Sequence, residues 1–190
     1  MRVIAGKARS LPLKAVEGTN TRPTTDRIKE TLFNMLQCDI SGSRFLDLYA
    51  GSGGIGIEAL SRGAVEAVFV DNSKAAVSVI KDNLAFTKLS SDGSCKADVM
   101  EMDALSAINR LAGRGVFDIV FMDPPYGQDL ERDVLLSLSK SNIIDNYTIV
   151  IIEEELHADI DYVIDFGYEI SKVKTYKTNK HVYLRLKGSV

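Results

Sequence analysis

The residues whose types and spacing are best suited to chemistry lie in the stretch FDIVFMDPPYG, residues 117–127. The apolar letters IVFM are typical of a short buried strand. That strand must end after Asp123, because neither Pro124 nor Pro125 can donate a backbone hydrogen bond to a neighbouring strand. The stiff turn that follows offers the Asp123 carboxylate, the Pro124 carbonyl and the ring of Tyr126. We infer that this turn can hold a planar base that carries an amino group.

A second stretch, DLYAGSGGIG at residues 47–56, has the spacing of a nucleotide-binding loop. Gly51, Gly53 and Gly56 match the pattern G-x-G-x-x-G, and Asp71 ends the next predicted strand. Glycines at these positions let the backbone approach a ligand closely, and the acid can bind the hydroxyls of a ribose. The pattern by itself does not distinguish a dinucleotide from another adenosine-containing cofactor.

Two further carboxylates favour S-adenosylmethionine over a nicotinamide dinucleotide. Asp47 lies just before the glycines, where its charge would repel phosphates but would suit the ammonium group of a methionine moiety. Asp103 ends another predicted strand, where a carboxylate can accept a hydrogen bond from the amino group of adenine. Both acids also have a purely structural interpretation, since Asp47 can cap a turn and Asp103 can cap the following helix.

The elements that must position these residues follow from the hydrophobic patterning. Strands alternate with helices, which is typical of a parallel sheet with helices on both faces. Because the carboxyl ends of parallel strands meet at one edge, we expect the glycine loop and the proline turn in the same crevice. The pattern predicts strands at 45–49, 67–70, 96–102, 117–122 and 148–152, and helices at 55–62, 74–87, 104–111 and 129–139. A helix-like segment at 157–166 precedes a final hairpin of strands 168–176 and 181–186, which turns at Thr178 and Asn179.

An N-terminal extension precedes this alternation. Residues 2–5 and 11–14 are expected to form two short strands, and the residues from Thr24 to Leu36 a helix that Thr24 or Thr25 caps. No linker separates a second domain. The sequence therefore predicts one domain over residues 1–190, with an extension at 1–37 and a catalytic core at 44–190.

Composition narrows the class of protein further. With 45% hydrophobic and 26% charged residues, the chain is typical of an ordinary globular domain, and no apolar run suggests a membrane span. Cys38 and Cys95 are isolated, so we expect core thiols in a reducing cytoplasm rather than a disulfide. We expect His157 and His181 at the surface. No His or Cys cluster has the spacing of metal ligands, so no metal is predicted.

Positive charge is concentrated at the two ends of the chain. Residues 1–29 hold seven Lys and Arg against two acids, and residues 170–190 hold six Lys and Arg and no acid. Basic ends on an acidic body suggest a polyanionic partner, although solvated terminal charge explains the pattern equally well. The candidates for phosphate contacts are Arg2, Lys7, Arg9, Arg22 and Arg27. Arg22 and Asp26 can instead be bonded to each other.

The central motifs LDLYAGSGGIGIEALSRGA and DPPY resemble those of class I S-adenosylmethionine-dependent methyltransferases that act on exocyclic amines. With the segments RVIAGKARSLPL and RPTTDRIKETLFNML, nearly the whole chain is similar to the bacterial family that methylates guanine N2 in 16S ribosomal RNA. DPPY alone marks amino methylation in general, and the two N-terminal segments are the specific part. The chain departs from the family in its mildly acidic charge and in a final turn, KTYKTNKHVY, without glycine.

The resemblance implies a seven-stranded, Rossmann-like sheet whose last strand is antiparallel to its neighbours. It implies a 16S rRNA substrate, presented within a small-subunit ribonucleoprotein, and a cytoplasmic enzyme; we expect a monomer. The implied site residues are Asp123, Pro124, Pro125 and Tyr126 for catalysis and Asp47, Tyr49, Ala50, Gly51, Gly53, Asp71, Asn72, Asp103 and Ala104 for S-adenosylmethionine.

The proline turn suggests how such an amine would be activated. Its lone pair is delocalised into the ring, so Asp123 and the Pro124 carbonyl would each accept one N–H while Tyr126 stacks on the base. Asp123 can also take the released proton. Glu153 ends a later strand and either borders the base pocket or is an ordinary strand-end acid.

Three rival functions share part of this pattern. An adenine-N6 methyltransferase that acts on DNA or another RNA would need the same turn, but the chain has no added recognition domain. A nicotinamide-dependent dehydrogenase would leave DPPY unexplained. A non-catalytic RNA-binding module would need neither the carboxylate nor the ring of this turn.

Overall fold

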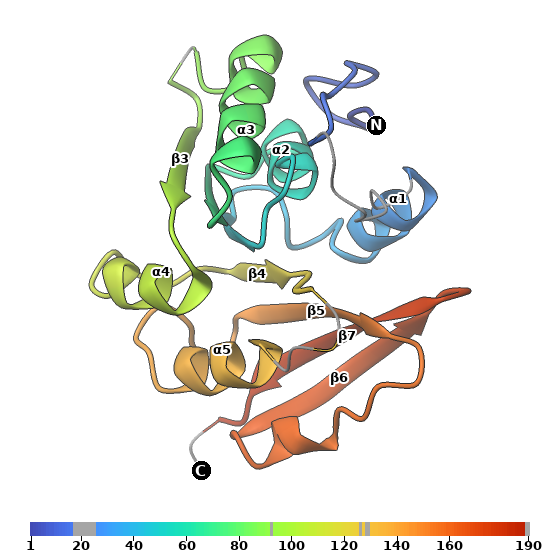
Figure 1. Cartoon of the computed structure of the whole chain (residues 1–190), viewed down its shortest axis with the longest axis vertical. Coiled ribbons are helices and arrows are strands. Elements are labelled where there is room, and N and C mark those ends of the chain that lie inside the picture. Colours follow the sequence, from blue (N-terminus) through green and yellow to red (C-terminus); the bar gives the residue numbers. More distant parts are fainter. Residues whose placement is uncertain (17–25, 92, 126, 128–129, 189–190) are drawn as a thin grey trace.

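The computed structural model describes residues 1–16, 26–91, 93–125, 127 and 130–188 (Figure 1). A single seven-stranded sheet runs through the molecule. Its strands are β1 (Arg44–Leu48), β2 (Glu66–Asp71), β3 (Lys96–Glu101), β4 (Ile119–Met122), β5 (Ile149–Glu155), β6 (Tyr168–Thr175) and β7 (Asn179–Leu186). They lie side by side in the order β3-β2-β1-β4-β5-β7-β6.

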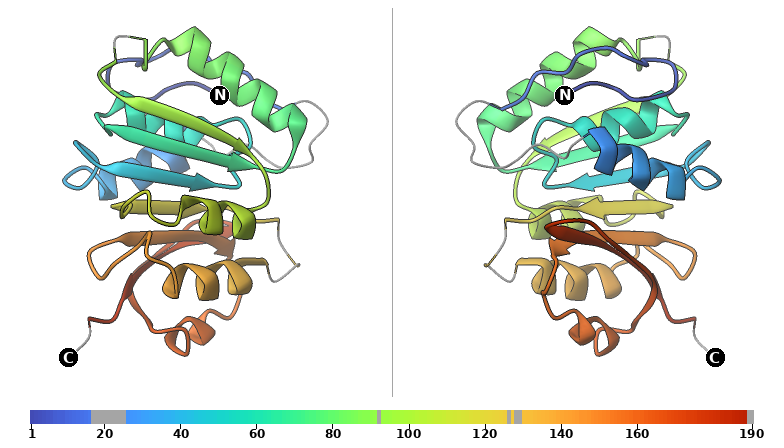
Figure 2. Two further views of the ribbon diagram at one scale, coloured as in Figure 1. Left: turned by 90° about the vertical axis from the view of Figure 1, so that its left-hand side faces the viewer. Right: turned by 90° about the vertical axis from the view of Figure 1, so that its right-hand side faces the viewer.

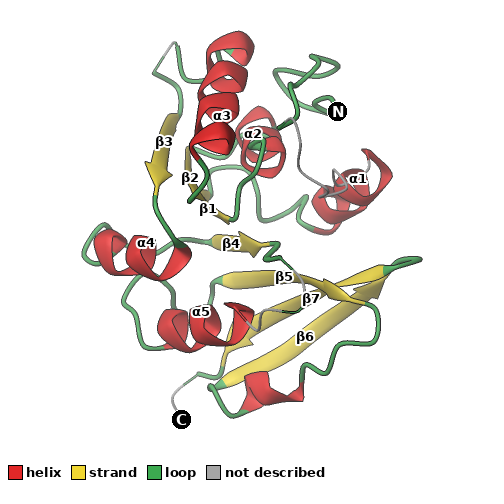
Figure 3. Cartoon of the chain, viewed as in Figure 1, coloured by secondary structure: helices red, strands yellow, loops and turns green. Residues whose placement is uncertain are grey.

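The first five strands are parallel, and β7 is antiparallel to both of its neighbours, as the resemblance implies (Figure 3). The four central strands are buried on both faces and therefore consist of nearly continuous apolar residues. The register pairs Leu48 with Met122 and Met122 with Ile152. Residues that follow these positions therefore emerge together at one edge of the sheet.

Helices cover both faces of the sheet (Figure 2). They are α1 (Asp26–Met35), α2 (Gly54–Ser61), α3 (Lys74–Thr87), α4 (Ala104–Leu111) and α5 (Leu130–Ser139), with a short 3₁₀ helix, η1 (Asp161–Ile164). Side chains of α4, α5 and η1 pack against one face, whereas those of α1, α2 and α3 pack against the other. Among the described residues, no helix combines the length and the apolar character that crossing a bilayer requires.

The predicted order of strands and helices is confirmed, with most ends correct to within a few residues. The helix expected at 157–166 is wrong, because only Asp161–Ile164 is helical and it is 3₁₀. The Asp159 carboxylate accepts the N–H of Asp161 at 2.9 Å and turns the chain there. Asn179 was expected in the hairpin turn but begins β7 and is buried.

The two N-terminal strands are also absent as regular elements. Their segments run antiparallel through a single bridge, between Arg2 and Pro12, and through backbone bonds such as Val3 N to Leu11 O at 3.0 Å. The proposed caps Thr24 and Thr25 lie outside the described residues.

A buried carboxylate joins the N-terminal segment to the core. Both oxygens of Glu58, on α2, accept backbone N–H groups, from Ile4 at 2.7 Å and from Ala5 at 3.0 Å. Arg62 Nε lies 2.7 Å and Lys29 Nζ 3.4 Å from the same carboxylate. Glu58 and Lys29 are fully buried, and burial lowers the pKa of Lys29 while Glu58 opposes that effect.

We expect Glu58→Ala to lower the free energy of unfolding by about 3–5 kcal/mol, because Lys29 would remain buried without its counter-ion. Urea denaturation measures this change. Asp82→Ala is the control, since its ion pair with Lys14 is exposed and should contribute less than about 1 kcal/mol. Equal effects of the two substitutions would contradict the assigned role of Glu58.

Candidate active site

A cavity of about 150 Å³ opens at the carboxyl ends of β1, β2 and β3. It joins residues that are far apart in the sequence, and five of the predicted cofactor residues line it: Tyr49, Asp71, Asn72, Asp103 and Ala104. The sequence did not single out the remaining lining residues, which are mostly apolar: Val70, Met102, Leu105, Leu130, Asp133 and Val134. Carboxylates on two sides of an apolar floor suit an adenosine moiety, whose flat ring is apolar and whose edges carry N–H and O–H donors.

The glycine loop borders this cavity and is held by two carboxylates. Asp71 accepts the N–H of Gly51 at 2.8 Å and that of Ser73 at 2.9 Å. Gly53 immediately precedes α2 and has a φ of 76°, which glycine adopts without strain. At Gly56 a Cβ atom would lie 2.3 Å from the ring of Phe69, so only glycine allows α2 to pack this closely on β2.

Asp47 lies beneath the loop rather than in the cavity wall. It is 1% exposed, and its carboxylate accepts the N–H of Gly56 at 2.9 Å. Burial raises the pKa of Asp47 to about 7, and the charge of Asp71 adds to the increase. The predicted capping role of Asp47 is thus present, while a role toward a bound ammonium group stays a prediction.

Asp103 also shows its structural role directly. Its carboxylate caps α4 by accepting the Ser106 N–H at 2.8 Å and the Ser106 hydroxyl at 2.7 Å. The hydrogen bond from the Ser106 backbone is the main reason that the pKa of Asp103 is lowered. A carboxylate has further lone pairs, so this cap leaves room for a donor in the cavity.

Tyr49 follows β1 with a φ of 63°, a left-handed conformation that is rare for a residue with a side chain. Its ring lines the cavity, and burial raises its pKa to about 12. Ala50 continues the loop, and its N–H is bound to the carbonyl of Val70 at 2.9 Å. The loop backbone is therefore tied to the end of β2 at two consecutive residues, Ala50 and Gly51.

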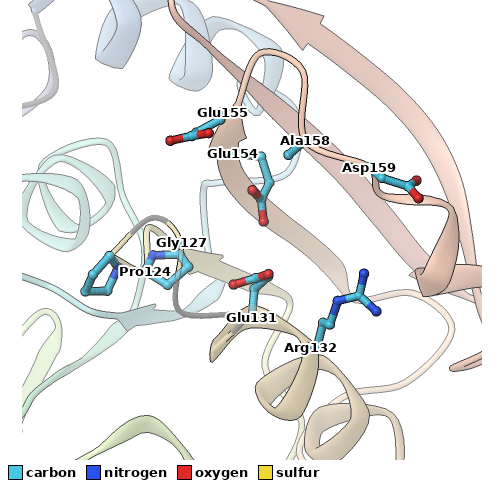
Figure 4. A pocket seen from close by; sticks show the side chains of 9 residues that line it. Pro124, Gly127, Glu131, Arg132, Glu154, Glu155, Ala158 and Asp159 are labelled. Carbon is cyan, nitrogen blue, oxygen red and sulfur yellow. The ribbon is translucent and has the colours of Figure 1, made fainter.

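Asp123 follows β4 at the same edge. The residue is only partly exposed, and this burial is the main reason that the pKa of Asp123 is raised well above the ordinary carboxyl value. The negative charge of Glu153 is the second cause of the increase. Pro124 and Pro125 line another cavity of about 240 Å³, which lies beside β5 and α5 (Figure 4). Tyr126 lies outside the described residues.

A buried hydrogen-bonded group lies next to Asp123 on β5 and β7. Glu153 pairs with His181 across the two strands, and His181 Nε2 is 3.0 Å from the Glu153 carboxylate. Asn179 donates to the other carboxylate oxygen, and the hydroxyl of Tyr176 is 3.1 Å from His181 Nδ1. The prediction that His181 is at the surface is wrong, because it is completely buried, whereas His157 is exposed.

The predicted phosphate-binding side chains lie on the N-terminal segment and α1. Arg2 Nε is 2.9 Å from the carboxylate of Asp26, and Arg22 lies outside the described residues. Lys7 Nζ is 3.2 Å from Ser94 Oγ, ahead of β3 and therefore at the edge of the sheet away from the cavities. Arg9 and Arg27 are exposed.

The extension also braces the glycine loop, through residues that the sequence did not single out for this role. Asn83 of α3 donates to the carbonyls of Ser52 at 2.9 Å and of Lys14 at 3.1 Å. The Met1 sulfur lies 3.8 Å from the hydroxyl of Ser52. The extension, α3 and the loop thus form one packed unit.

Comparisons with known proteins agree with this geometry. The family model described as "Conserved hypothetical protein 95" matches residues 1–185. The chain belongs to this family. It is 36% identical over 155 residues to "Ribosomal RNA small subunit methyltransferase D" of Haemophilus influenzae, an alignment that covers 82% of this chain and 79% of the relative. The protein of the same name from Escherichia coli is 34% identical over 82% of this chain and 75% of its own.

A solved structure supports the family at the level of the fold. A protein of Thermus thermophilus, described as hypothetical, superposes with a TM-score of 0.81 at 26% identity, covering 98% of this chain and 99% of that one. The family and the class I methyltransferase fold expected from the sequence are both confirmed.

The burial of Asp47 makes the free energy of unfolding depend on pH. The folded protein binds a proton with a pKa of about 7, whereas the unfolded chain releases it near 3.8. Stability is therefore lost as the pH rises between these values, by up to about 4 kcal/mol. We expect Asp47→Asn to remove the contribution of Asp47 to this pH dependence, about 2–3 kcal/mol between pH 5 and pH 8, as urea denaturation at these two values would show. Parallel pH dependence of both proteins would contradict the assignment.

Proposed function

We propose that this protein transfers a methyl group from S-adenosylmethionine to the N2 amine of a guanine in 16S ribosomal RNA. One observation is central: the turn at Asp123 and the cavity beside Asp71 lie at the same edge of the sheet. The names of the relatives supply the class of RNA, and the turn supplies the class of chemistry.

The residues of the cavity fit the cofactor. Asp71 would bind the ribose hydroxyls, Asp103 the adenine amino group, and Met102 and Val134 the faces of the ring. Asp47 would balance the ammonium group of the methionine moiety from beneath the loop. S-adenosylmethionine, when bound, supplies a methyl group activated by a sulfonium. Tyr49, Ala50, Gly51, Gly53, Asn72 and Ala104 would shape the surface that it contacts.

Asp123 and the carbonyl of Pro124 would hold the two N–H groups of the guanine amine. Two aimed acceptors draw the nitrogen out of conjugation with the ring and direct its lone pair along one line. Pro125 keeps the carbonyl fixed, since its ring restricts the backbone. Tyr126, the next residue, would stack on the base and fix its plane.

The electrostatics at Asp123 suit the release of a proton. Burial and the neighbouring charges of Glu153, Asp47 and Glu154 raise its pKa, so its carboxylate binds a proton more tightly than an ordinary aspartate. As methylation makes the amine acidic, Asp123 would accept the proton that leaves it. Ionised Asp123 is the active form.

The RNA would approach with its target base unstacked, since the turn cannot be reached inside a helix. Exposed Arg2 and Arg27 on the extension would contact phosphates near the site, while Lys7 and Arg9 require RNA that extends to the far edge. Arg22 completes the predicted set. We propose a monomer that acts in the cytoplasm on the RNA of an assembling small subunit.

The proposal is tested by transfer of an isotopically labelled methyl group to naked 16S RNA, assembled small subunits and DNA. Nucleoside mass spectrometry should identify N2-methylguanosine in RNA, with the highest yield from subunits. N6-methyladenosine as the product would instead establish the adenine-N6 rival, and the absence of any labelled nucleoside would contradict an enzymatic role.

Asp123→Asn should lower kcat by about 100-fold or more, because the amide cannot accept the proton. Cofactor binding and the unfolding transition should stay near wild type. Asp39→Asn, an equal change at an exposed loop, serves as the control and should keep full activity. Near-normal transfer by the Asp123 variant would rule out the mechanism.

Asp71→Ala should weaken S-adenosylmethionine binding about 10-fold or more, because it removes a ribose ligand and frees the N–H of Gly51. Isothermal titration calorimetry measures the affinity, with Asp82→Asn as an exposed control on α3. An unchanged affinity, or tight binding of NADH by the wild type, would disprove the cofactor assignment.

A further inference from the structure

The 240 Å³ cavity beside the proline turn shares no described lining residue with the cavity proposed for the cofactor. Pro124 and Pro125 form one wall, and residues from α5 and the end of β5 form the others. Among the described residues that line it, four are acids, Glu131, Glu154, Glu155 and Asp159, and one is a base, Arg132. The Arg132 guanidinium lies over the ring of Tyr162, 4.0 Å from its centroid. This charge balance repels phosphate and favours a ligand that presents hydrogen-bond donors.

One of these acids has an unsatisfied oxygen. Glu154 is 8% exposed, and its Oε1 is buried without a hydrogen-bond partner in the part of the chain that the structure describes. Figure 4 shows its side chain directed into the cavity, toward Glu131. Burial and the charge of Glu131 raise the pKa of Glu154 to about 7. A buried carboxylate oxygen without a donor is costly, and a ligand N–H would remove that cost.

Nearby groups explain why no donor among the described residues fills this place. Lys180 pairs with Glu154 across β5 and β7, but its Nζ donates to the carbonyl of Ala158 at 2.6 Å. The charge of Lys180 lowers the pKa of Glu154, but burial and the charge of Glu131 raise it by more. The negative charge of Glu154 also contributes to the raised pKa of Asp123, which places the two carboxylates in one electrostatic site.

We propose that Glu154 accepts the N1–H of the target guanine and thereby selects guanine over adenine. This inference rests on the proposed function. A guanine whose N2 amine is held by Asp123 and the Pro124 carbonyl presents its N1–H beside that amine, on the same edge of the ring. Adenine carries an acceptor at N1, which would face the Glu154 carboxylate without a hydrogen and be repelled.

The cavity position favours a base over a peptide as the occupant. Its wall is the turn that holds the reacting amine, so whatever enters lies directly against the target. A basic side chain of a ribosomal protein would also satisfy Glu154. That alternative predicts an effect on assembled subunits only, which the experiment separates.

The test compares two RNA substrates that differ at the methylated position. One carries guanosine, and the other carries 2-aminopurine, which keeps the 2-amino group but has an acceptor in place of N1–H. Methyl transfer is measured at pH 8, where Glu154 is mostly ionised. The wild type should prefer guanosine by about 10-fold or more in kcat/KM.

Glu154→Ala and the isosteric Glu154→Gln should reduce this preference toward unity, mainly by slowing transfer to guanosine. The ratio of kcat/KM on the two substrates can be measured with residual activity alone, so it remains measurable if a variant is less stable. Glu169→Gln makes the same charge change on exposed β6 and should keep the wild-type ratio.

A wild type without preference, or Glu154 variants that lose activity equally on both substrates, would overturn the proposal. A loss confined to assembled subunits would also overturn it, in favour of a protein contact. Failure of the proposed function is distinct from all of these, because the wild type would then form no N2-methylguanosine on the guanosine substrate.

Discussion

The placement of like-charged carboxylates at one edge of the sheet is the constraint on which this site depends. Parallel β1, β2, β4 and β5 bring four acids to this edge: Asp71 ends β2, Asp123 follows β4, and Asp47 and Glu153 lie near the ends of β1 and β5. Burial is the main reason that the pKa values of Asp47 and Asp123 are raised, and the charges of neighbouring acids add to the increase. A cationic cofactor and an amine that loses a proton are the partners that such an edge favours.

The rest of the chain holds this unfavourable arrangement in place. Backbone N–H groups of the glycine loop donate to the carboxylates of Asp47 and Asp71 and so fix the positions of both acids. On the other side, His181 and Asn179 hold Glu153 in a fixed orientation. The N-terminal extension reaches the same loop through Asn83 and is itself secured at Glu58. These hydrogen bonds and packing contacts thus stabilise a site whose carboxylates repel one another.

Local patterning was sufficient to predict the parallel core and the placement of Asp71 and Asp103 at one edge, because strand ends and glycine spacing can be recognised within short segments. Tyr49, Asn72 and Ala104, which line the same cavity, came from the family resemblance instead. Local patterning failed for residues whose surroundings are set by pairing between segments that are distant in the sequence. His181 looks like a surface residue in sequence, and only the antiparallel register of β7 brings it to Glu153. The free oxygen of Glu154 and the salt bridge of Lys29 likewise depend on packing between distant segments. The assignments at Tyr126 and Arg22 remain predictions from the sequence.

The most direct test of this account is the pH dependence of single-turnover methyl transfer in the wild type and in Glu153→Gln. The wild-type rate should fall as the pH decreases through a value well above the ordinary carboxyl range, where Asp123 becomes protonated. Removal of the Glu153 charge should move that midpoint to lower pH, since this charge helps to raise the pKa of Asp123. A midpoint that is the same in both proteins, or a wild-type rate that is constant from pH 5 to pH 8, would contradict the role of Asp123 as the proton acceptor.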